Sequence, residues 1–168
     1  MKTLRICTAA LLLFAAALSA TCAQAIQQID VIGLGIYRGD RIKQEDAPTT
    51  PAGVLGQVAN LELIEETTTI PALRGVRFGF VFKIRGQTGA KVRLKFVILI
   101  PQPGIRNGGT GNRLVRGEYF QDLAVGDLSY MGYKFDYPWE IAPGNWIFEI
   151  WNGDRRLTSQ TFNVMASV

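Results

Sequence analysis

The sequence predicts an all-β fold, an antiparallel β-sandwich of about seven short strands. Two observations predict it: apolar and polar residues alternate along short runs, and turn residues, mainly glycine and proline, separate these runs. No apolar pattern with the period of an α-helix continues over a dozen residues after the N-terminal segment. The expected strands span residues 29–37, 61–67, 76–85, 91–100, 128–137, 145–151 and 157–164.

The third expected strand shows the alternation most clearly. Phe78, Phe80 and Phe82 share one face of this strand, whereas Lys83 and Arg85 lie on the other face. Such a pattern is typical of a strand with one face in the core and one face in water. We therefore expect the three phenylalanines in the centre of the sandwich.

The connection from the third to the fourth expected strand is expected to be an arch between two sheets. A hairpin would place Arg85 opposite Lys91 and Lys83 opposite Arg93, and like charges directly opposite one another destabilise a sheet. An arch separates these charges and keeps the apolar faces of both strands together. This connection is typical of an immunoglobulin-like sandwich.

The N-terminal segment has the three parts of a secretory signal peptide. Lys2 and Arg5 form a basic start, residues 6–18 are almost wholly apolar, and the small residues Ala23 and Ala25 precede a cleavage site. The apolar run is too short to span a bilayer as a helix. We therefore expect a cleaved signal peptide that ends at Ala25; a buried N-terminal helix is the alternative.

Cys22 allows a second interpretation of this segment, the attachment of a lipid. A lipid-attachment motif has a large aliphatic residue three positions before the cysteine and Gly or Ala directly before it, but Ser19 and Thr21 occupy these positions. We therefore expect release into the periplasm or the medium, with anchoring through Cys22 as the alternative. The mature chain then comprises residues 26–168, a length that suits a single β-sandwich domain.

The composition of the mature chain excludes several classes of function. Both cysteines lie in the segment that we expect to be removed, and the sequence contains no histidine. Disulfides, the preferred zinc and copper ligands and the imidazole base of Ser-His-Asp catalysis are then all lacking. Without Lys2 and Arg5, 16 of the 18 basic residues remain against 14 acidic ones, too weak an excess to predict nucleic-acid binding. We expect no cofactor, and no transmembrane segment in the mature chain.

Two tryptophans lie close together in the sixth expected strand. Trp146 shares a face with Phe148 and Ile150 and is therefore expected in the core. Trp151 shares a face with Glu149 beside an Asn-Gly turn, so at least part of its ring is expected to meet water. Covering a cross-strand neighbour is the role that we favour for Trp151, and contact with a partner is the alternative.

Two segments, residues 39–59 and 101–117, are expected to be long loops. Loops of this length in a compact domain are either functional or mobile. The second segment contains five glycines. Its run Gly108–Gly111 is not followed by the Gly-Lys-Ser/Thr ending of a phosphate-binding loop, so the sequence does not predict nucleotide binding there.

The second long segment also contains three arginines and no acidic residue. An arginine can place its planar fork on a carboxylate or a phosphate, so an anionic partner would suit this segment. A mobile basic loop without a dedicated site is the alternative. The candidate contacts to a partner are Arg106, Arg113, Arg116 and Trp151.

Carboxylates are the remaining candidates for catalysis or metal binding. A pair of them can hydrolyse a glycosidic bond, but the adjacent Glu65 and Glu66 point to opposite faces of a strand. Glu118, Asp122 and Asp127 do not have the spacing of a calcium-binding loop. We therefore expect these side chains to be solvated, and the sequence assigns no catalytic residue and no metal ligand.

Several short motifs occur along the mature chain, and they consist of turn glycines, core aromatic residues and a closing hairpin. They are Gly35-Ile36-Tyr37, Thr50-Pro51-Ala52-Gly53, Arg77-Phe78-Gly79 and Pro143-Gly144-x-Trp146 with Phe162-x-Val164. Together they resemble a bacterial family called domain of unknown function 3859, over nearly all of the mature chain. The resemblance supports an exported, immunoglobulin-like fold and implies no activity, ligand or site.

The sequence therefore favours an exported, non-enzymatic interaction module whose partner is a protein or an anionic envelope polymer. A carboxylate-based hydrolase acting on an envelope glycan, with its carboxylates in residues 118–127, is the alternative. A structural observation separates the two classes. Two carboxylates that converge in a cleft with raised pKa values favour the enzyme, and scattered solvated carboxylates favour the module.

Overall fold

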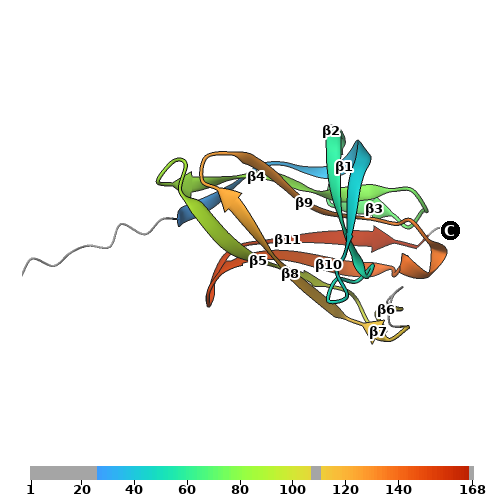
Figure 1. Ribbon diagram of the computed structural model, residues 1–168. Helices are drawn as coiled ribbons and strands as arrows, with labels where there is room; N and C mark the ends of the chain where they lie inside the picture. Colours follow the sequence, from blue (N-terminus) through green and yellow to red (C-terminus); the bar gives the residue numbers. More distant parts are fainter. Residues whose placement is uncertain (1–25, 107–110, 167–168) are drawn as a thin grey trace, which may run out of the picture.

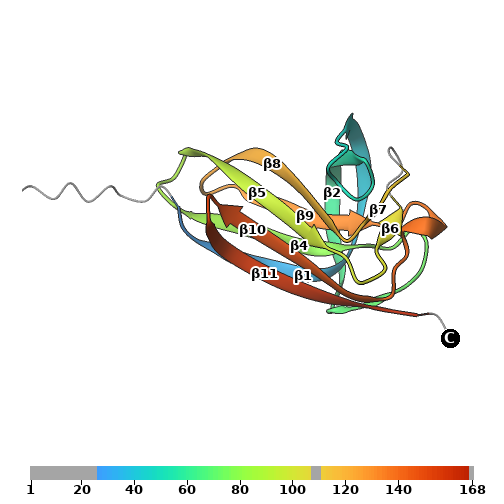
Figure 2. The same ribbon diagram turned by 90° about the horizontal axis from the view of Figure 1, so that it is seen from below.

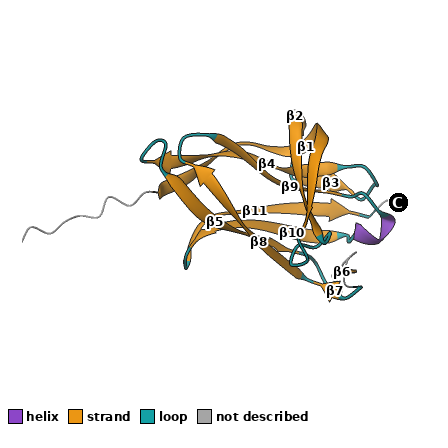
Figure 3. Ribbon diagram, in the orientation of Figure 1, coloured by secondary structure: helices purple, strands orange, loops and turns teal. Residues whose placement is uncertain are grey.

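Two β-sheets pack face to face in the computed structural model, which describes residues 26–106 and 111–166 (Figure 1). In this part of the chain one short 3-10 turn, η1, accompanies the strands (Figure 3), and no helix is long and apolar enough to cross a bilayer. The elements are β1 (Ile26–Asp46), β2 (Val54–Glu66), β3 (Thr69–Pro71), β4 (Arg77–Gly86), β5 (Lys91–Leu99), β6 (Ile105–Arg106), β7 (Arg113–Leu114), β8 (Arg116–Ala124), β9 (Leu128–Lys134), η1 (Pro138–Glu140), β10 (Gly144–Asn152) and β11 (Arg155–Met165).

The two sheets have four and five strands. The first has the order β2-β1-β4-β9 and the second has the order β3-β11-β10-β5-β8, while β6 and β7 form a separate two-stranded ribbon. Neighbouring strands are antiparallel, except that the short β3 runs parallel to β11. The view from below shows the two layers (Figure 2). The predicted all-β antiparallel sandwich is therefore confirmed.

All seven expected strands are present, and four further strands accompany them. β3, β6 and β7 are only two or three residues long, whereas β8 has nine residues and was missed. β8 lies at an edge of its sheet and pairs with β5 alone. The apolar Phe120 stands between Glu118 and Asp122 on one face of β8, so the strand lacks the regular alternation that reveals a strand in a sequence.

The arch predicted between the third and fourth expected strands is confirmed. β4 belongs to the four-stranded sheet and β5 to the five-stranded sheet. Arg85 at the end of β4 lies opposite Gln28, and Lys91 at the start of β5 lies opposite Ala124. The two positive ladders are thus kept in different sheets, as the repulsion argument requires.

Aromatic side chains fill the space between the sheets. Trp146 is completely buried, and its ring meets that of Phe78 edge to face at 5.8 Å. The indole Nε1 of Trp146 donates a hydrogen bond of 2.8 Å to the carbonyl oxygen of Ala142, so its one polar group is satisfied inside the core. Phe148 stacks on Phe78 from the same strand as Trp146. Trp146 is therefore a core residue, as predicted.

Residues 39–59 do not form the long loop that the sequence suggested. β1 continues to Asp46 and β2 begins at Val54, and the two strands pair as an antiparallel ribbon from Arg38–Glu62 to Asp46–Val54. Much of this ribbon is exposed on both faces, so its sequence has no apolar face from which a strand could be predicted. We call residues 38–62 the arm; it crosses the direction of the other strands (Figure 1).

The tip of the arm is attached to the five-stranded sheet. The backbone N–H of Glu118 in β8 donates a hydrogen bond of 3.0 Å to the carbonyl oxygen of Thr49. Pro51 packs so closely on Gly117 that a Cβ atom at this glycine would lie 2.4 Å from the proline ring. The hydroxyl of the buried Thr50 donates within the tip, 2.7 Å from the carbonyl oxygen of Ala47. The arm therefore starts in one sheet and ends on the other.

Candidate functional site

The arm meets the η1 turn and the β6–β7 ribbon at one end of the sandwich (Figure 1). Two hollows of about 550 and 410 Å³ adjoin there. Arg41 of the arm lines the larger hollow, Arg113 lines the smaller one, and Arg106 and Trp139 line both. The two hollows thus form one elongated depression, which we call the end groove.

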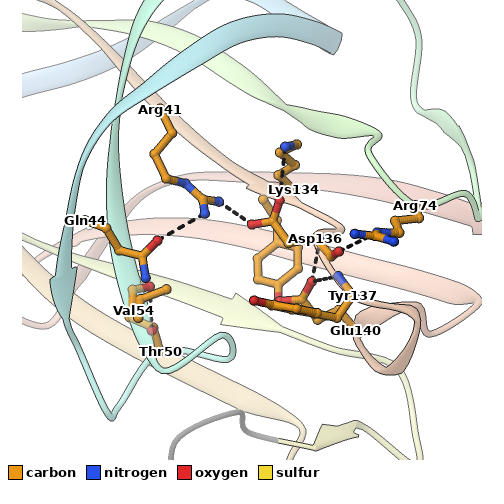
Figure 4. Close-up of polar contacts among 10 residues, drawn as sticks. Arg41, Gln44, Thr50, Val54, Arg74, Lys134, Asp136, Tyr137 and Glu140 are labelled. Carbon is orange, nitrogen blue, oxygen red and sulfur yellow. Dashed lines mark hydrogen bonds and ion pairs between the residues drawn. The ribbon is translucent and has the colours of Figure 1, made fainter.

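The η1 turn is held by the buried carboxylate of Glu140. One oxygen, Oε2, accepts backbone N–H bonds from Asp136 at 2.5 Å and from Tyr137 at 2.7 Å (Figure 4). The other oxygen accepts the hydroxyl of Tyr133 at 3.1 Å. Burial raises the pKa of Glu140 above its ordinary value, although the three hydrogen bonds favour the ionised form.

Asp136 connects the turn to the arm. Its carboxylate forms ion pairs with Arg41 of the arm and, at 3.0 Å, with Lys134 of β9 (Figure 4). Burial opposes ionisation of Asp136, but the hydrogen bonds and charges of Arg41 and Lys134 outweigh it and hold the pKa of Asp136 below its usual value. Arg74 adds a hydrogen bond of 2.8 Å to the backbone carbonyl of Asp136.

Asp136 and Glu140 both line the arm side of the end groove and are the structure's closest counterpart of a two-carboxylate enzyme site. Their pKa values are displaced in opposite directions. However, all four carboxylate oxygens are engaged by donors of the protein itself. A general acid or a nucleophile needs an oxygen that faces the substrate. This geometry suits a clamp that fixes the turn and the arm.

An aromatic pair stands on the surface of the same turn. The rings of Tyr137 and Trp139 stack at 5.5 Å with an interplanar angle of 9°. Trp139 is 37% exposed and Tyr137 is 54% exposed. Analysis of the sequence missed both residues and Arg41. Two aromatic residues around the proline of an expected turn were a usable signal, because such a turn cannot bury them within a regular strand.

The predicted arginine segment is more ordered than expected. Arg106 and Arg113 face one another across β6 and β7, and both line the end groove. The guanidinium of Arg113 donates to the carbonyl oxygen of Gly104 at 3.1 Å. Arg116 differs: it belongs to β8 and forms an ion pair of 3.1 Å with Glu118. Arg116 thus has an acidic partner within the chain, and contact of the three arginines with an external partner stays a prediction; residues 108–110 of the glycine run lie outside the described residues.

Trp151 lies on the outer face of the five-stranded sheet, away from the end groove. It is half-buried, and its Nε1 donates a hydrogen bond of 2.9 Å to Glu149. Lys95 and Arg156 lie over its ring at 5.3 and 5.7 Å from the ring centre. These contacts come from the neighbouring strands, so the ring covers cross-strand neighbours, which is the role favoured from the sequence.

The other carboxylates singled out in the sequence do not converge. Glu65 and Glu66 are exposed on β2, and Asp127 is exposed in the turn before β9. Glu118 and Asp122 share a face of β8 but are four residues, or about 13 Å, apart along the strand. Within residues 26–106 and 111–166, no three His, Cys, Asp or Glu side chains are grouped as ligands for a metal ion.

Comparison with known protein families identifies the relatives of this chain. The family model for domain of unknown function 3859 matches residues 26–164. The chain belongs to this family. The match confirms the resemblance seen in the short sequence motifs, and this family is defined by its sequence and has no assigned function.

Among solved structures, an immunoglobulin-like protein from Pseudomonas aeruginosa is similar to this chain. The TM-score is 0.59 and the identity is 23%, over 84% of this chain and 99% of that protein. At this identity the likeness shows the fold alone, which is an immunoglobulin-like sandwich as predicted. No curated protein matches the chain.

Two other solved structures share less with this chain. An alkylpurine DNA glycosylase from Pseudomonas fluorescens matches with a TM-score of 0.35 and 14% identity, over 59% of this chain and 28% of that protein. A β-glucosidase from Listeria innocua matches with a TM-score of 0.37 and 12% identity, over 68% of this chain and 17% of that protein. Both similarities are too low to support an argument about function.

Proposed function

We propose that this protein is an exported, non-enzymatic interaction module that binds an anionic partner in the end groove. The partner is an anionic polymer of the cell envelope or an acidic surface of an envelope protein. The observation that carries the proposal is the meeting of Arg106 and Trp139 between the two hollows. A cation beside an exposed aromatic ring combines a charged contact with an apolar one at a single point.

The charge of the groove supports an anionic partner. Arg106 is exposed, and no carboxylate in the described part of the chain forms an ion pair with it. Arg113 is exposed too, and its guanidinium donates to the neutral carbonyl of Gly104. Neither charge is needed to hold a carboxylate of the described chain, so both are available to a carboxylate or phosphate from outside.

A pair of charge-matched variants tests the groove. We expect Arg106→Ser with Arg113→Ser to weaken retention on a bacterial cell-envelope fraction about tenfold or more at low salt, because one hydrogen bond to a charged group contributes about 1.5–3 kcal/mol. The control is Arg93→Ser with Arg116→Ser, which removes two exposed charges of the same sign outside the groove. Equal retention of the two double variants would show that net charge, and not the groove, holds the partner.

Export is part of the same proposal. The family model matches the chain from residue 26, which follows the expected cleavage site at Ala25. Ile26 is completely buried, and Arg155 donates a hydrogen bond of 2.9 Å to its carbonyl oxygen. We expect mass spectrometry of the protein purified from the periplasm or the medium to give a mature chain that starts at Ile26. A diacylglyceryl group on Cys22 would instead make the protein a membrane-anchored lipoprotein.

A further inference from the structure

A third hollow, of about 600 Å³, lies between the arm and the edges of the sandwich and adjoins the larger hollow of the end groove, with which it shares the lining residues Arg41, Val54 and Asp136. Gln57 and Val58 of the arm line one side, and residues of β8 and β9 line the other. Phe120 and Leu128, two of the most exposed apolar side chains, also line it. Phe120 and Leu128 thus form an exposed apolar part of the wall, where Arg93 lies over the ring of Phe120 at 5.3 Å from the ring centre.

Arg77, at the start of β4, lines this hollow and is only 7% exposed. Its neighbours across the sheet are Tyr37 of β1 and Lys134 of β9, neither of which carries a negative charge to balance it. None of the ion pairs among the described residues includes Arg77. Of the carboxylates that line the hollow, Asp136 is already paired with Arg41 and Lys134, and Glu45 with Lys43.

A buried guanidinium without a carboxylate is unfavourable, because desolvation of the charge is not offset by a nearby opposite charge. The hydroxyl of the neighbouring Tyr130 accepts a hydrogen bond from Arg77 and donates one of 3.1 Å to the carbonyl oxygen of Phe78. Burial raises the pKa of Tyr130, so this hydroxyl stays neutral and cannot balance the charge. Arg77 therefore lacks the anion that would make its position favourable.

The geometry points to a ligand site: we propose that this hollow binds a small monocarboxylate with an aromatic or aliphatic body, whose carboxylate pairs with Arg77. The planar fork of arginine matches a carboxylate with two parallel hydrogen bonds. One buried positive charge matches a single negative charge better than the two charges of a phosphate. The apolar body lies along Phe120 and Leu128, two exposed apolar side chains of the hollow.

Titration calorimetry of the mature domain tests this site with phenylacetate and hexanoate as probes. We expect saturable binding of at least one of them, and at least tenfold weaker binding of phenylacetamide, the neutral isostere of phenylacetate, and of inorganic phosphate. The comparison of these ligands uses the wild-type domain alone, so its result does not depend on whether an Arg77 variant folds. Absence of saturable binding for both carboxylates, or equal affinity for phenylacetamide, overturns the proposal.

Two variants separate a binding role of Arg77 from a structural one. We expect Arg77→Met to lose carboxylate binding at least tenfold while its melting temperature in an anion-poor buffer stays equal to or rises above that of wild type. Val58→Trp fills the hollow from the arm without touching the charge, and we expect it to lose binding while it remains folded. A lower melting temperature of Arg77→Met with unchanged carboxylate affinity would show that Arg77 is structural and overturn the site. Retention on the envelope fraction, which depends on the end groove, is expected to be unaffected by Arg77→Met.

Discussion

The interior of the sandwich and the end that carries the arm differ in how they use aromatic side chains: the interior buries them, and the arm end exposes them. In the interior, Phe78, Trp146 and their neighbours are completely buried, and their rings pack on one another. At the arm end, Tyr137 and Trp139 stack in the open, and arginines line the hollows. In the interior the aromatic rings are buried and stabilise the fold, whereas at the arm end both aromatic rings and charged groups are exposed to solvent. This difference is the reason that we propose the binding surface at the arm end.

The three tryptophans show the same difference between buried and exposed aromatic side chains. Trp146 is enclosed by the core, and Trp151 is held between Lys95 and Arg156 on a sheet face. Trp139 is 37% exposed, and its ring stacks on that of Tyr137. A tryptophan with an exposed surface beside arginines is suited to contact a partner, while the other two already have their partners within the protein.

The largest expected effect separates the interior from the sheet face. Trp146→Ala should lower the free energy of unfolding by about 3–5 kcal/mol, the usual cost of truncating a large buried aromatic residue. Trp151→Ala should lower it by roughly 1–2 kcal/mol, because two cation–π contacts at about 0.5–1 kcal/mol each are lost and part of the ring already meets water. Chemical denaturation measures both values, and equal losses would contradict the assignment of the strand faces.

The clamp at the η1 turn is expected to have a smaller, pH-dependent effect. Glu140→Gln should destabilise the protein at acidic pH, where Glu140 is protonated, by about 0.5–1.5 kcal/mol, the net contribution of a hydrogen bond between neutral groups. The pKa of Glu140 is raised in the folded state, so the folded protein binds its proton more tightly than the unfolded chain. The contribution of Glu140 is therefore fully present below the unfolded pKa and is lost as the pH rises through the folded pKa.

The stability difference between wild type and Glu140→Gln should accordingly shrink as the pH rises from about 4 towards 8. Denaturation curves at several pH values measure this difference directly. Glu118→Gln provides the control, because Glu118 is only partly buried and lies on an edge strand. A difference that grows with pH would mean that the hydrogen bonds to Glu140, and not its burial, determine its protonation.

The smallest effect on folding is expected from the arginines singled out in the sequence. Replacement of Arg106, Arg113 and Arg116 by serine should change the melting temperature by no more than a few degrees, since exposed ion pairs contribute about 0–1 kcal/mol. Arg116 contributes the one ion pair of this set, with Glu118. A large loss of stability, seen by calorimetry, would assign these side chains to folding and remove the argument that they serve a partner.

The fold was largely predictable because strands with one face in the core show a regular alternation of apolar residues in the sequence. Phe78, Phe80, Phe82 and Ile84 recur at every second position because the face of β4 that carries them is buried. The arm escaped prediction because much of it is exposed on both faces, and β8 because its outer face carries the apolar Phe120 between Glu118 and Asp122. Where β1 and β2 extend beyond the sheet as the arm, their residues show no apolar–polar alternation, so the length of these strands could not be inferred from the sequence.

The candidate site was predictable only in part. Arg106 and Arg113 stood out because three cations without an acid occur in a glycine-rich segment. Arg41 and Trp139 gave no such signal, since they are 98 residues apart in the sequence and line the same hollow only after the arm folds over the end of the sandwich. The buried Arg77 looked like an ordinary solvent-facing residue of an alternating strand, because the arm that covers it was expected to be a loop.

The most direct test of the account compares two tryptophans that are both partly exposed. Trp139→Ala removes the aromatic surface of the end groove, whereas Trp151→Ala removes a ring from the sheet face outside it. Retention of the two folded variants on the envelope fraction at low salt is the measurement. If the partner binds in the end groove, we expect Trp139→Ala to lose retention and Trp151→Ala to be retained like wild type. Loss of retention by Trp151→Ala alone would place the binding surface on the five-stranded sheet and contradict the account.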